Sequence, residues 1–345
     1  MKFRYFIPNS DHTERVGMGF SIIIPVKEIN AYIRESIPIT LKLDYSEFEI
    51  IILPNDPVSE QDLPPYLKDP RVSIIATGRV SPAVKRDIGA KHSSYDYLAF
   101  LDDDAFPQSD WLKVAETTLR ERQVEALGGP AITPKNSSLG EQASGLFFET
   151  LVGGGGLSYR YKPVKKSFFV DDYPTVNLIV SKSSFDSIGG FDNNYWPGED
   201  TKFCLDLVNA GYKILYVPEL IVWHHRRELF LPHLKQIGGY GRHRGYFART
   251  FPKTSLRPTY FAPSVFAVGN FSLAILSIWS ALFLKIWICL LIIYFSACTI
   301  DVFSRTKRPI LGFLTTIVTF FSHMTYGCMF LRGLFSSSHF RSHLR

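Results

Sequence analysis

The stretch Tyr97-Leu98-Ala99-Phe100-Leu101-Asp102-Asp103-Asp104 joins an apolar run directly to three carboxylates. An apolar run of this length that includes Tyr and Phe is typical of a buried strand. In an extended chain, residues two apart face the same side, so Asp102 and Asp104 can hold one divalent cation while Asp103 points away. Two carboxylates leave coordination positions that substrate phosphates usually fill. We therefore predict a metal–diphosphate site rather than a solvated acidic turn.

The first part of the chain alternates predicted strands with predicted helices. This alternation predicts an α/β fold with a doubly wound, mostly parallel, Rossmann-like sheet. Ligands bind beyond the carboxyl ends of the strands in such sheets, and the polar pairs Lys27/Glu28 and Asn55/Asp56 both follow strand ends. Strands are predicted at 20–25, 49–53, 72–76, 97–101, 168–172, 177–180, 212–217 and 220–223, and helices at 28–41, 82–93 and 110–119.

Several common classes of protein are disfavoured by missing motifs. The sequence has no GxGxxG after its first strand and no GxxxxGK[ST], which argues against a dinucleotide-binding Rossmann domain and a P-loop nucleotidase. Its four cysteines show no CxxC spacing, so neither a disulfide framework nor a zinc site is expected. The first 19 residues lack the pattern of a signal peptide. We expect the globular part to stay in the cytosol.

Two glycine-containing segments have both a structural and a functional interpretation. The four glycines at 153–156 indicate a mobile loop, which is either a plain connector or a lid over substrate. The segment Trp196-Pro197-Gly198-Glu199-Asp200 begins a helix that is predicted to run to about Ala210. Acidic residues in a first helical turn are ordinary partners of the helix dipole, so Glu199 and Asp200 alone do not indicate catalysis.

In combination, these motifs resemble those of the family 2 glycosyltransferases of the GT-A fold, which use nucleotide-activated sugars. The resemblance covers roughly residues 18–250, and it is the order of the pieces that makes it specific. The matching pieces are Ile22-Ile23-Ile24-Pro25 with Glu28, Asn55-Asp56, Lys85-Arg86-Asp87-Ile88-Gly89, Leu101-Asp102-Asp103-Asp104, Ile188-Gly189-Gly190-Phe191-Asp192, Gly198-Glu199-Asp200 and Val222-Trp223-His224.

The resemblance implies roles for the matched positions. The nucleobase would lie near Pro25, and Asp200 would be the catalytic base. The histidine doublet leaves open whether His224 or His225 completes the metal site, and we favour His224. The implied residues are Pro25, Glu28, Asp56, Arg86, Asp102 and Asp103 for the nucleotide-sugar, Asp102, Asp104 and His224 for Mn²⁺ or Mg²⁺, and Asp200 with Glu199 for catalysis.

The chemistry of glycosyl transfer agrees with these roles. A divalent cation offsets the charge that develops on the departing diphosphate. A separate carboxylate must take the proton of the acceptor hydroxyl as that oxygen attacks C1 of the sugar. A single in-line displacement of this kind inverts the anomeric centre. The sequence supplies a carboxylate pair for the metal and another acid for the base.

The charge distribution divides the chain into two parts. Residues 1–225 carry a net charge of −7, whereas residues 226–345 carry a net charge of +13. An acidic globular part followed by a basic, apolar part predicts contact with anionic membrane lipids rather than nucleic acid. The predicted regions are a catalytic domain at 1–225, a basic juxtamembrane linker at 226–258, a membrane region at 259–335 and a basic tail at 336–345.

Three apolar segments in the membrane region are candidate spans. Two of them, 261–281 and 283–303, are long enough to cross a bilayer as a hairpin. The third, 310–331, is more polar and is expected to be interfacial, re-entrant or spanning. Basic clusters flank every end of these segments, and the positive-inside rule places all of them in the cytosol. We therefore predict a protein of the cell membrane with a cytoplasmic catalytic domain.

The sequence thus predicts a membrane-anchored, inverting glycosyltransferase with a UDP-sugar as the expected donor and a lipid-linked or surface saccharide as acceptor. The alternatives are a polyprenyl-phosphate sugar synthase, a non-catalytic membrane adaptor with a degenerate transferase domain, and a metal-dependent phosphohydrolase. Processive synthases of the family carry a QxxRW motif. This chain has Gln236-Ile237-Gly238-Gly239-Tyr240 instead, which argues against a polymerase.

Overall fold

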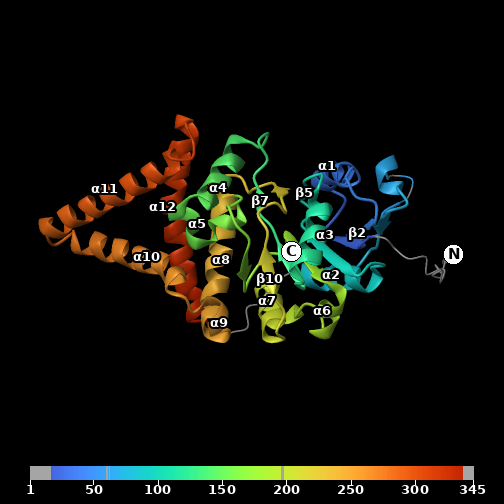
Figure 1. Cartoon of the computed structure of the whole chain (residues 1–345). Helices are drawn as coiled ribbons and strands as arrows, with labels where there is room; N and C mark the ends of the chain where they lie inside the picture. The colour runs from blue at the N-terminus through green and yellow to red at the C-terminus, as the bar shows by residue number, and fades with distance from the viewer. Residues whose placement is uncertain (1–16, 60, 62, 196–197, 337–345) are drawn as a thin grey trace.

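The computed structural model describes residues 17–59, 61, 63–195 and 198–336. It contains a mixed α/β body, a layer of two long helices beside that body, and a helical hairpin that projects from the layer (Figure 1). The basic tail predicted at 336–345 lies outside the described residues apart from Ser336, and so do Trp196 and Pro197.

The body is built on an eight-stranded sheet in the order β3-β2-β1-β4-β9-β6-β10-β8. The first four strands are parallel, β9 is antiparallel to its neighbours β4 and β6, β10 is parallel to β6, and β8 is antiparallel to β10. The predicted α/β class is therefore confirmed, with two antiparallel strands in the second half. The bounds are β1 Phe20–Pro25, β2 Phe48–Leu53, β3 Val72–Ile74, β4 Tyr97–Leu101, β6 Ala126–Gly128, β8 Phe168–Val170, β9 Asn177–Ser181 and β10 Ile214–Tyr216.

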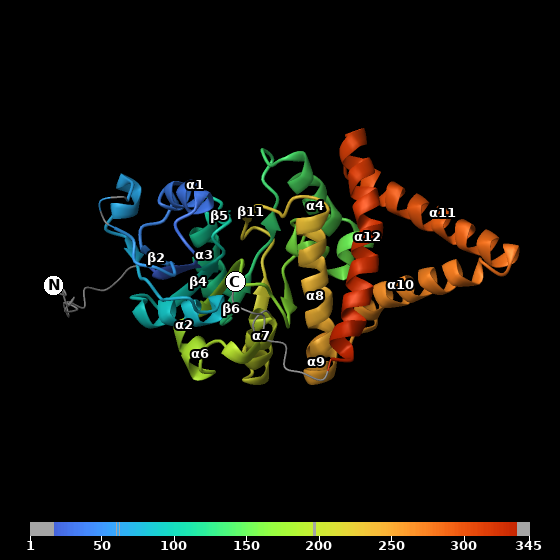
Figure 2. The ribbon, with the colours of Figure 1, turned by 180° about the vertical axis from the view of Figure 1, so that it is seen from behind.

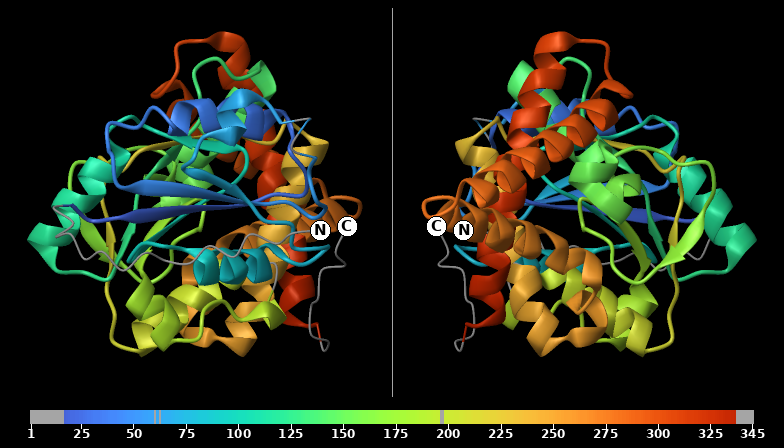
Figure 3. Two further views of the ribbon diagram at one scale, coloured as in Figure 1. Left: turned by 90° about the vertical axis from the view of Figure 1, so that its right-hand side faces the viewer. Right: turned by 90° about the vertical axis from the view of Figure 1, so that its left-hand side faces the viewer.

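Helices cover both faces of this sheet, as the edge-on view of the strands shows (Figure 3). Ile22 and Ile24 of β1 share one core with α1 and α3, whereas Ile23 shares the opposite core with α2, α6 and α7. Because both faces are covered, β1 is buried along its whole length and is apolar apart from Ser21, as is usual for parallel strands. The helices are α1 Ala31–Thr40, α2 Pro82–His92, α3 Trp111–Arg122, α6 Lys182–Ser187 and α7 Glu199–Asn209.

A small second sheet extends the body beyond the carboxyl end of β4. It has the order β5-β11-β7, with β5 at Ala105–Pro107, β11 at Val222–His224 and β7 at Ala131–Ile132. β5 and β11 are antiparallel, and their register places His224 opposite Ala105. This pairing brings the histidine next to the acidic turn, although the two are far apart in the sequence.

The glycine run at 153–156 is not a loop, which corrects the sequence prediction. Gly153 and Gly154 lie in the short helix α5 (Leu151–Gly154), and a 3-10 helix, η3, continues from Gly155 to Arg160. A Cβ atom added to Gly153 or Gly154 would lie 2.2 Å from the carbonyl oxygen of Phe147 or 1.9 Å from that of Phe148. These two glycines are therefore required for close backbone packing and do not provide flexibility.

The C-terminal part of the chain is helical. The first helix, α8, lies along α12, and α10 and α11 form the projecting hairpin on the other side of α12 (Figure 2). The three helices α10, α11 and α12 are each long and apolar enough to cross a membrane by length and composition. The C-terminal helices are α8 Leu231–Thr250, α9 Pro252–Ser255, α10 Pro258–Leu276, α11 Ala281–Phe303 and α12 Pro309–Leu334. Helix α4, which comes earlier in the chain, spans Leu139–Glu149.

Helix α8, which forms much of the predicted basic linker, has one buried face. Glycines allow the close packing, since a Cβ atom on Gly245 would lie 2.0 Å from the carbonyl oxygen of Phe330 in α12. The charge of Arg244 is accommodated because its guanidinium pairs with the buried carboxylate of Asp172. The domain boundaries at 225 and 258 remain predictions.

We expect two glycine-to-alanine substitutions in α8 to have opposite effects on stability. Gly245→Ala forces α8 away from α12 and should lower the free energy of unfolding by about 1–3 kcal/mol. A Cβ atom on Gly239 meets nothing within 4 Å. Gly239→Ala should therefore raise the free energy of unfolding by roughly 0.5–1 kcal/mol. Thermal unfolding in detergent measures both. Equal stability of the two variants would contradict the packing described here.

Candidate active site

The acidic residues that follow β4 form a tight turn in which the amide of Ala105 donates to the carbonyl of Asp102 over 3.2 Å. The sequence prediction assumed an extended backbone here, and the turn corrects it. Asp102 and Asp104 nevertheless come together, while Asp103 contacts Asn30 instead. Asp103 accepts a hydrogen bond from Asn30, the N-cap residue of α1. Burial and the nearby charge of Asp104 raise the pKa of Asp103 to about 6.

Asp102, Asp104 and His224 come together as one cluster. Their possible ligand atoms, one from each side chain, lie within 4.8 Å of one another. Asp104 is buried, and its Oδ1 lies 3.0 Å from Nε2 of His224. Burial alone would raise the pKa of Asp104, but His224 and Arg227 hold it at about 2. Two carboxylates and an imidazole form a donor set that Mn²⁺ accepts readily.

The neighbouring histidine, His225, faces away from this cluster. Its Nε2 lies 3.1 Å from Glu35, and its ring centroid lies 5.1 Å from that of Tyr32. Its Nδ1 lies 3.7 Å from Glu141. Of the two histidines that the sequence left open, His224 is therefore the one placed to contact a cation.

Arg226 determines the proton position on His224. Its Nη1 lies 2.8 Å from Nδ1 of His224, and a guanidinium only donates. Nδ1 therefore accepts, and in the neutral ring Nε2 carries the proton that faces Asp104. A cation at Nε2 requires the other tautomer, so Arg226 would have to release Nδ1 when the metal binds. The three residues fit a cation with that one adjustment.

A buried guanidinium connects the acidic turn to the second acidic motif. Arg86 of α2 lies 2.9 Å from Asp102 through Nη2 and 3.0 Å from Glu199 through Nη1. Its side chain is 4 % exposed. Because one planar group contacts both carboxylates, the Asp102–Asp104 turn and the Glu199–Asp200 motif share one site.

Glu199 and Asp200 occupy the first turn of α7. The helix is preceded by Gly198, whose φ of +111° favours glycine. Burial raises the pKa of Glu199 to about 7, against the effect of Arg86. Burial and the charge of Asp172 raise the pKa of Asp200, whose Oδ1 accepts the Thr201 amide over 2.8 Å.

The residues predicted to hold the nucleobase lie at the carboxyl ends of β1 and β2. Pro25 ends β1, and the side chains of Glu28 and Asp56 are exposed there. A residue that the sequence argument gave no role, Lys85, joins the two strand ends: its Nζ donates to the carbonyls of Val26 and Leu53 over 2.5 and 3.0 Å. Burial lowers the pKa of Lys85 to about 8.

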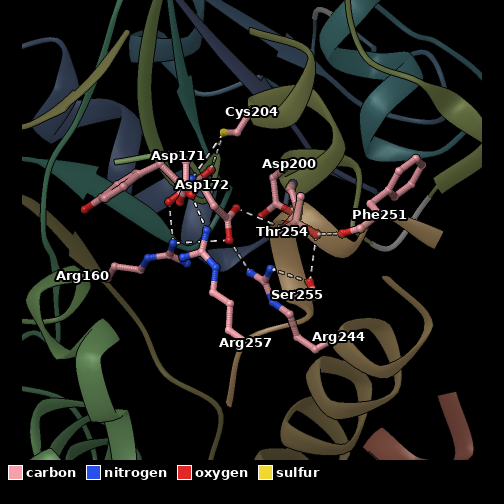
Figure 4. Close-up of polar contacts among 12 residues, drawn as sticks. Arg160, Asp171, Asp172, Asp200, Cys204, Arg244, Phe251, Thr254, Ser255 and Arg257 are labelled. Atoms are coloured by element: carbon pink, nitrogen blue, oxygen red, sulfur yellow. Dashed lines mark hydrogen bonds and ion pairs between the residues drawn. The ribbon is translucent and has the colours of Figure 1, made fainter. Parts of the chain in front are cut away.

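Asp172 is a second residue that sequence reasoning missed, since Asp171-Asp172 had been assigned only as the end of a strand. Its buried carboxylate lies between two arginines, close to the turn that carries Asp200 (Figure 4). No local pattern distinguishes it from Asp171, because its importance depends on contacts with distant helices.

Two family models match the chain. The model described as glycosyl transferase family 2 matches residues 21–171, and the one described as glycosyl transferase family group 2 matches residues 97–332. The second covers more than half of the chain and includes the acidic turn, the Glu-Asp motif and the apolar helices. The chain belongs to the family 2 glycosyltransferases.

Comparisons with relatives and with a solved structure agree with this assignment. The chain is 30% identical over 150 residues to the pre-mycofactocin glycosyltransferase of Mycobacterium tuberculosis, a match that spans 43% of this chain and only 31% of that protein. It is 24% identical over 327 residues to a dolichyl N-acetyl-α-D-glucosaminyl phosphate 3-β-D-2,3-diacetamido-2,3-dideoxy-β-D-glucuronosyltransferase of Methanococcus voltae, covering 91% of this chain and 96% of the relative.

The mannosyltransferase PcManGT from Pyrobaculum calidifontis, solved with GDP-mannose and Mn²⁺, has a similar fold. Its TM-score is 0.61 at 13% identity, over 94% of this chain and 89% of that one. At this identity the likeness concerns the fold alone. It confirms the predicted GT-A architecture for this family 2 glycosyltransferase.

We predict that Asp104→Asn and Asp103→Asn differ in their effect on metal binding. Asp104 faces His224, whereas Asp103 faces Asn30. Asp104→Asn should weaken Mn²⁺ binding by about tenfold or more, since changes to supporting residues already cost about 10–100-fold. Asp103→Asn should retain it. Titration of the free Mn²⁺ signal by electron paramagnetic resonance measures both affinities, and equal losses would contradict the assignment.

Proposed function

We propose that the protein is a membrane-bound, inverting glycosyltransferase that moves a sugar from a nucleotide-sugar to a lipid-linked saccharide. The observation that carries this proposal is the contact of Arg86 with both Asp102 and Glu199. It supports one site with two sides, a metal–diphosphate side at the acidic turn and a proton-accepting side at α7.

The donor is a nucleotide-sugar, with UDP as the expected nucleotide. Its base lies near Pro25, Glu28 and Asp56, and its ribose and diphosphate lie near Asp102, Asp103 and Arg86. A divalent cation, Mn²⁺ or Mg²⁺, is held by Asp102, Asp104 and His224, and it supplies charge neutralisation for the leaving diphosphate. Arg86 adds a fixed positive charge beside it.

Asp200 takes the proton of the acceptor hydroxyl as the acceptor oxygen attacks C1. A raised pKa suits this role, because a base is most effective when its pKa lies close to the working pH. Glu199 keeps Arg86 in place from the other side and is a positioning residue. Because the base and the leaving diphosphate lie on opposite sides of the sugar, the displacement inverts the anomeric centre.

The acceptor is proposed to be lipid-linked, since the Methanococcus voltae relative is named for a dolichyl phosphate-linked substrate and matches most of this chain. The polyprenyl-phosphate sugar synthase is the second candidate, because the same apolar helices would serve it. Its product, a phosphodiester-linked sugar, is cleaved by mild acid, whereas a glycosidic bond survives.

A donor panel tests this function. Radiolabelled nucleotide-sugars are incubated with the protein, Mn²⁺ or Mg²⁺ and a lipid extract, and label is counted in the lipid fraction. The proposal requires metal-dependent transfer of label that resists mild acid. Acid-labile label identifies the phosphate synthase, release of free sugar or phosphate without an acceptor identifies a phosphohydrolase, and no turnover with any donor supports a non-catalytic adaptor.

Asp200→Asn should lower the rate of transfer by about 10²–10⁴-fold, because it removes only the proton acceptor. Calorimetry should show nearly unchanged binding of UDP with Mn²⁺, since Asp200 lies on the acceptor side. Parallel loss of transfer and nucleotide binding would count against Asp200 as the base.

We also propose a placement in the cell membrane, with the α10–α11 hairpin crossing the bilayer and the catalytic domain on the cytoplasmic side. In this proposal α12 does not cross, because its start contacts α4 and its end packs against α8. At its start Arg308 donates to Gln142 of α4, and near its end a Cβ atom on Gly333 would lie 2.0 Å from the carbonyl of Arg242 in α8. α12 then lies at the level of the lipid head groups.

Cysteine labelling in sealed, right-side-out vesicles tests this topology. A membrane-impermeant maleimide should label Trp279→Cys, at the turn between α10 and α11, and should not label Ser336→Cys until the vesicles are opened. Lys165→Cys in the catalytic domain should behave like Ser336→Cys. Labelling of Ser336→Cys in intact vesicles, with Lys165→Cys protected, would establish three crossings and overturn this placement.

A further inference from the structure

The carboxylate of Asp172 joins three separate parts of the molecule (Figure 4). Its Oδ2 pairs with Arg244 of α8 and lies 3.4 Å from Nη2 of Arg160 at the end of η3. Its Oδ1 accepts a hydrogen bond of 3.1 Å from the hydroxyl of Thr201 in α7. Asp172 is 5 % exposed and Arg160 is 8 % exposed, so solvent screens these charges little.

Arg244 carries this connection towards the membrane region. Its Nη1 donates to the Ser255 hydroxyl of α9 over 3.3 Å. Its guanidinium carbon lies 5.1 Å from the ring centroid of Tyr260, in the first turn of α10. One guanidinium therefore contacts the start of the helical hairpin and the carboxylate that holds α7.

The first turn of α7 is also the turn that carries Asp200. Thr201 donates its hydroxyl to Asp172 and its amide to Asp200, so the two carboxylates are connected through a single residue. Gly198 fits closely against α8, because a Cβ atom there would lie 2.9 Å from Nδ1 of His243. The position of Asp200 is thus set by contacts with α8 as well as by the sheet.

We propose that Asp172 and Arg244 are positioning residues for the base: their ion pair fixes the first turn of α7 against α8 and supplies charges that surround Asp200. This inference rests on the proposed function, in which Asp200 accepts the proton of the acceptor. It assigns a role in catalysis to two residues outside the motifs from which the family was recognised.

The two partners act on Asp200 with opposite sign. The negative charge of Asp172 raises the pKa of Asp200, and the positive charge of Arg244 lowers it. Both arginines hold the pKa of Asp172 well below its ordinary value. We expect Asp172 to stay ionised when Arg244 is replaced, because Arg160 still pairs with it. Within the described part of the chain, the main charged or titratable groups coupled to Asp200 are Glu199 and Cys204 of α7, Arg86 of α2, Tyr240 and Arg244 of α8, and Asp172.

The test is the pH dependence of the rate of transfer at a limiting donor concentration. The assay contains saturating Mn²⁺, lipid extract and the radiolabelled UDP-sugar that the donor panel selects. A base must be deprotonated, so activity falls as the pH drops through its pKa. We call this fall in activity at low pH the acid limb. Asp172→Asn should move the acid limb to lower pH, and Arg244→Gln should move it to higher pH, each by about half a pH unit or more.

Opposite shifts separate a charge effect from loss of structure. If the ion pair served only to hold α7 and α8 together, both variants would lower the rate without moving the limb, or would move it in the same direction. Arg244→Lys, which keeps the charge, should return the limb towards the wild-type position. Asp171→Asn is the matched control, since Asp171 pairs with Arg257 at the surface, and it should leave the limb in place.

Failure of this inference is distinguishable from failure of the proposed function. If Asp200→Asn abolishes transfer while Asp172→Asn and Arg244→Gln leave the limb unmoved or shift it in the same direction, Asp200 stays the base and the positioning role is overturned. If Asp200→Asn retains full transfer, the base assignment itself is wrong, and the positioning role is overturned with it.

Discussion

The buried guanidinium of Arg86 is the contact on which the candidate site depends. It joins Asp102, at the end of a central strand, to Glu199, at the start of a helix 97 residues later. The pair with Glu199 is buried on both sides, and breaking a buried ion pair by removing one partner typically costs about 3–5 kcal/mol. Asp102 is partly exposed, so solvent weakens its pair with Arg86. Arg86 therefore stabilises the two acidic motifs and fixes their position relative to one another.

A second set of contacts extends from the Glu199–Asp200 motif towards the apolar helices. Helix α8 lies between the body and α12, with glycines on the α12 side and Arg244 on the side of Asp172. The first turn of α7 therefore contacts the same helix that packs against α12. Under the proposed placement, the base is supported from the side on which a lipid-linked acceptor arrives, so anchoring and acceptor binding use one structural element.

Sequence patterns predicted those parts of the fold and site that depend on neighbouring residues. The isoleucine run of β1 and the Leu101–Asp104 stretch were sufficient to place a buried strand and its acidic end. Asp172, Arg226 and Arg244 were not predicted, because their partners are set by strand pairing and helix packing between distant segments. The run at Gly153 and Gly154 was misinterpreted for a related reason: a glycine run is equally consistent with a flexible loop and with close backbone contact, and only the contacts with Phe147 and Phe148 distinguish the two.

In the proposed mechanism, a cation at the Asp102–Asp104 turn holds the diphosphate of the donor. Electron–nuclear double resonance of the Mn²⁺-loaded protein with UDP tests it most directly. We expect a ³¹P coupling from the diphosphate together with a ¹⁴N coupling from the imidazole of His224. A Mn²⁺ spectrum that UDP leaves unchanged, with no ³¹P coupling, would contradict it.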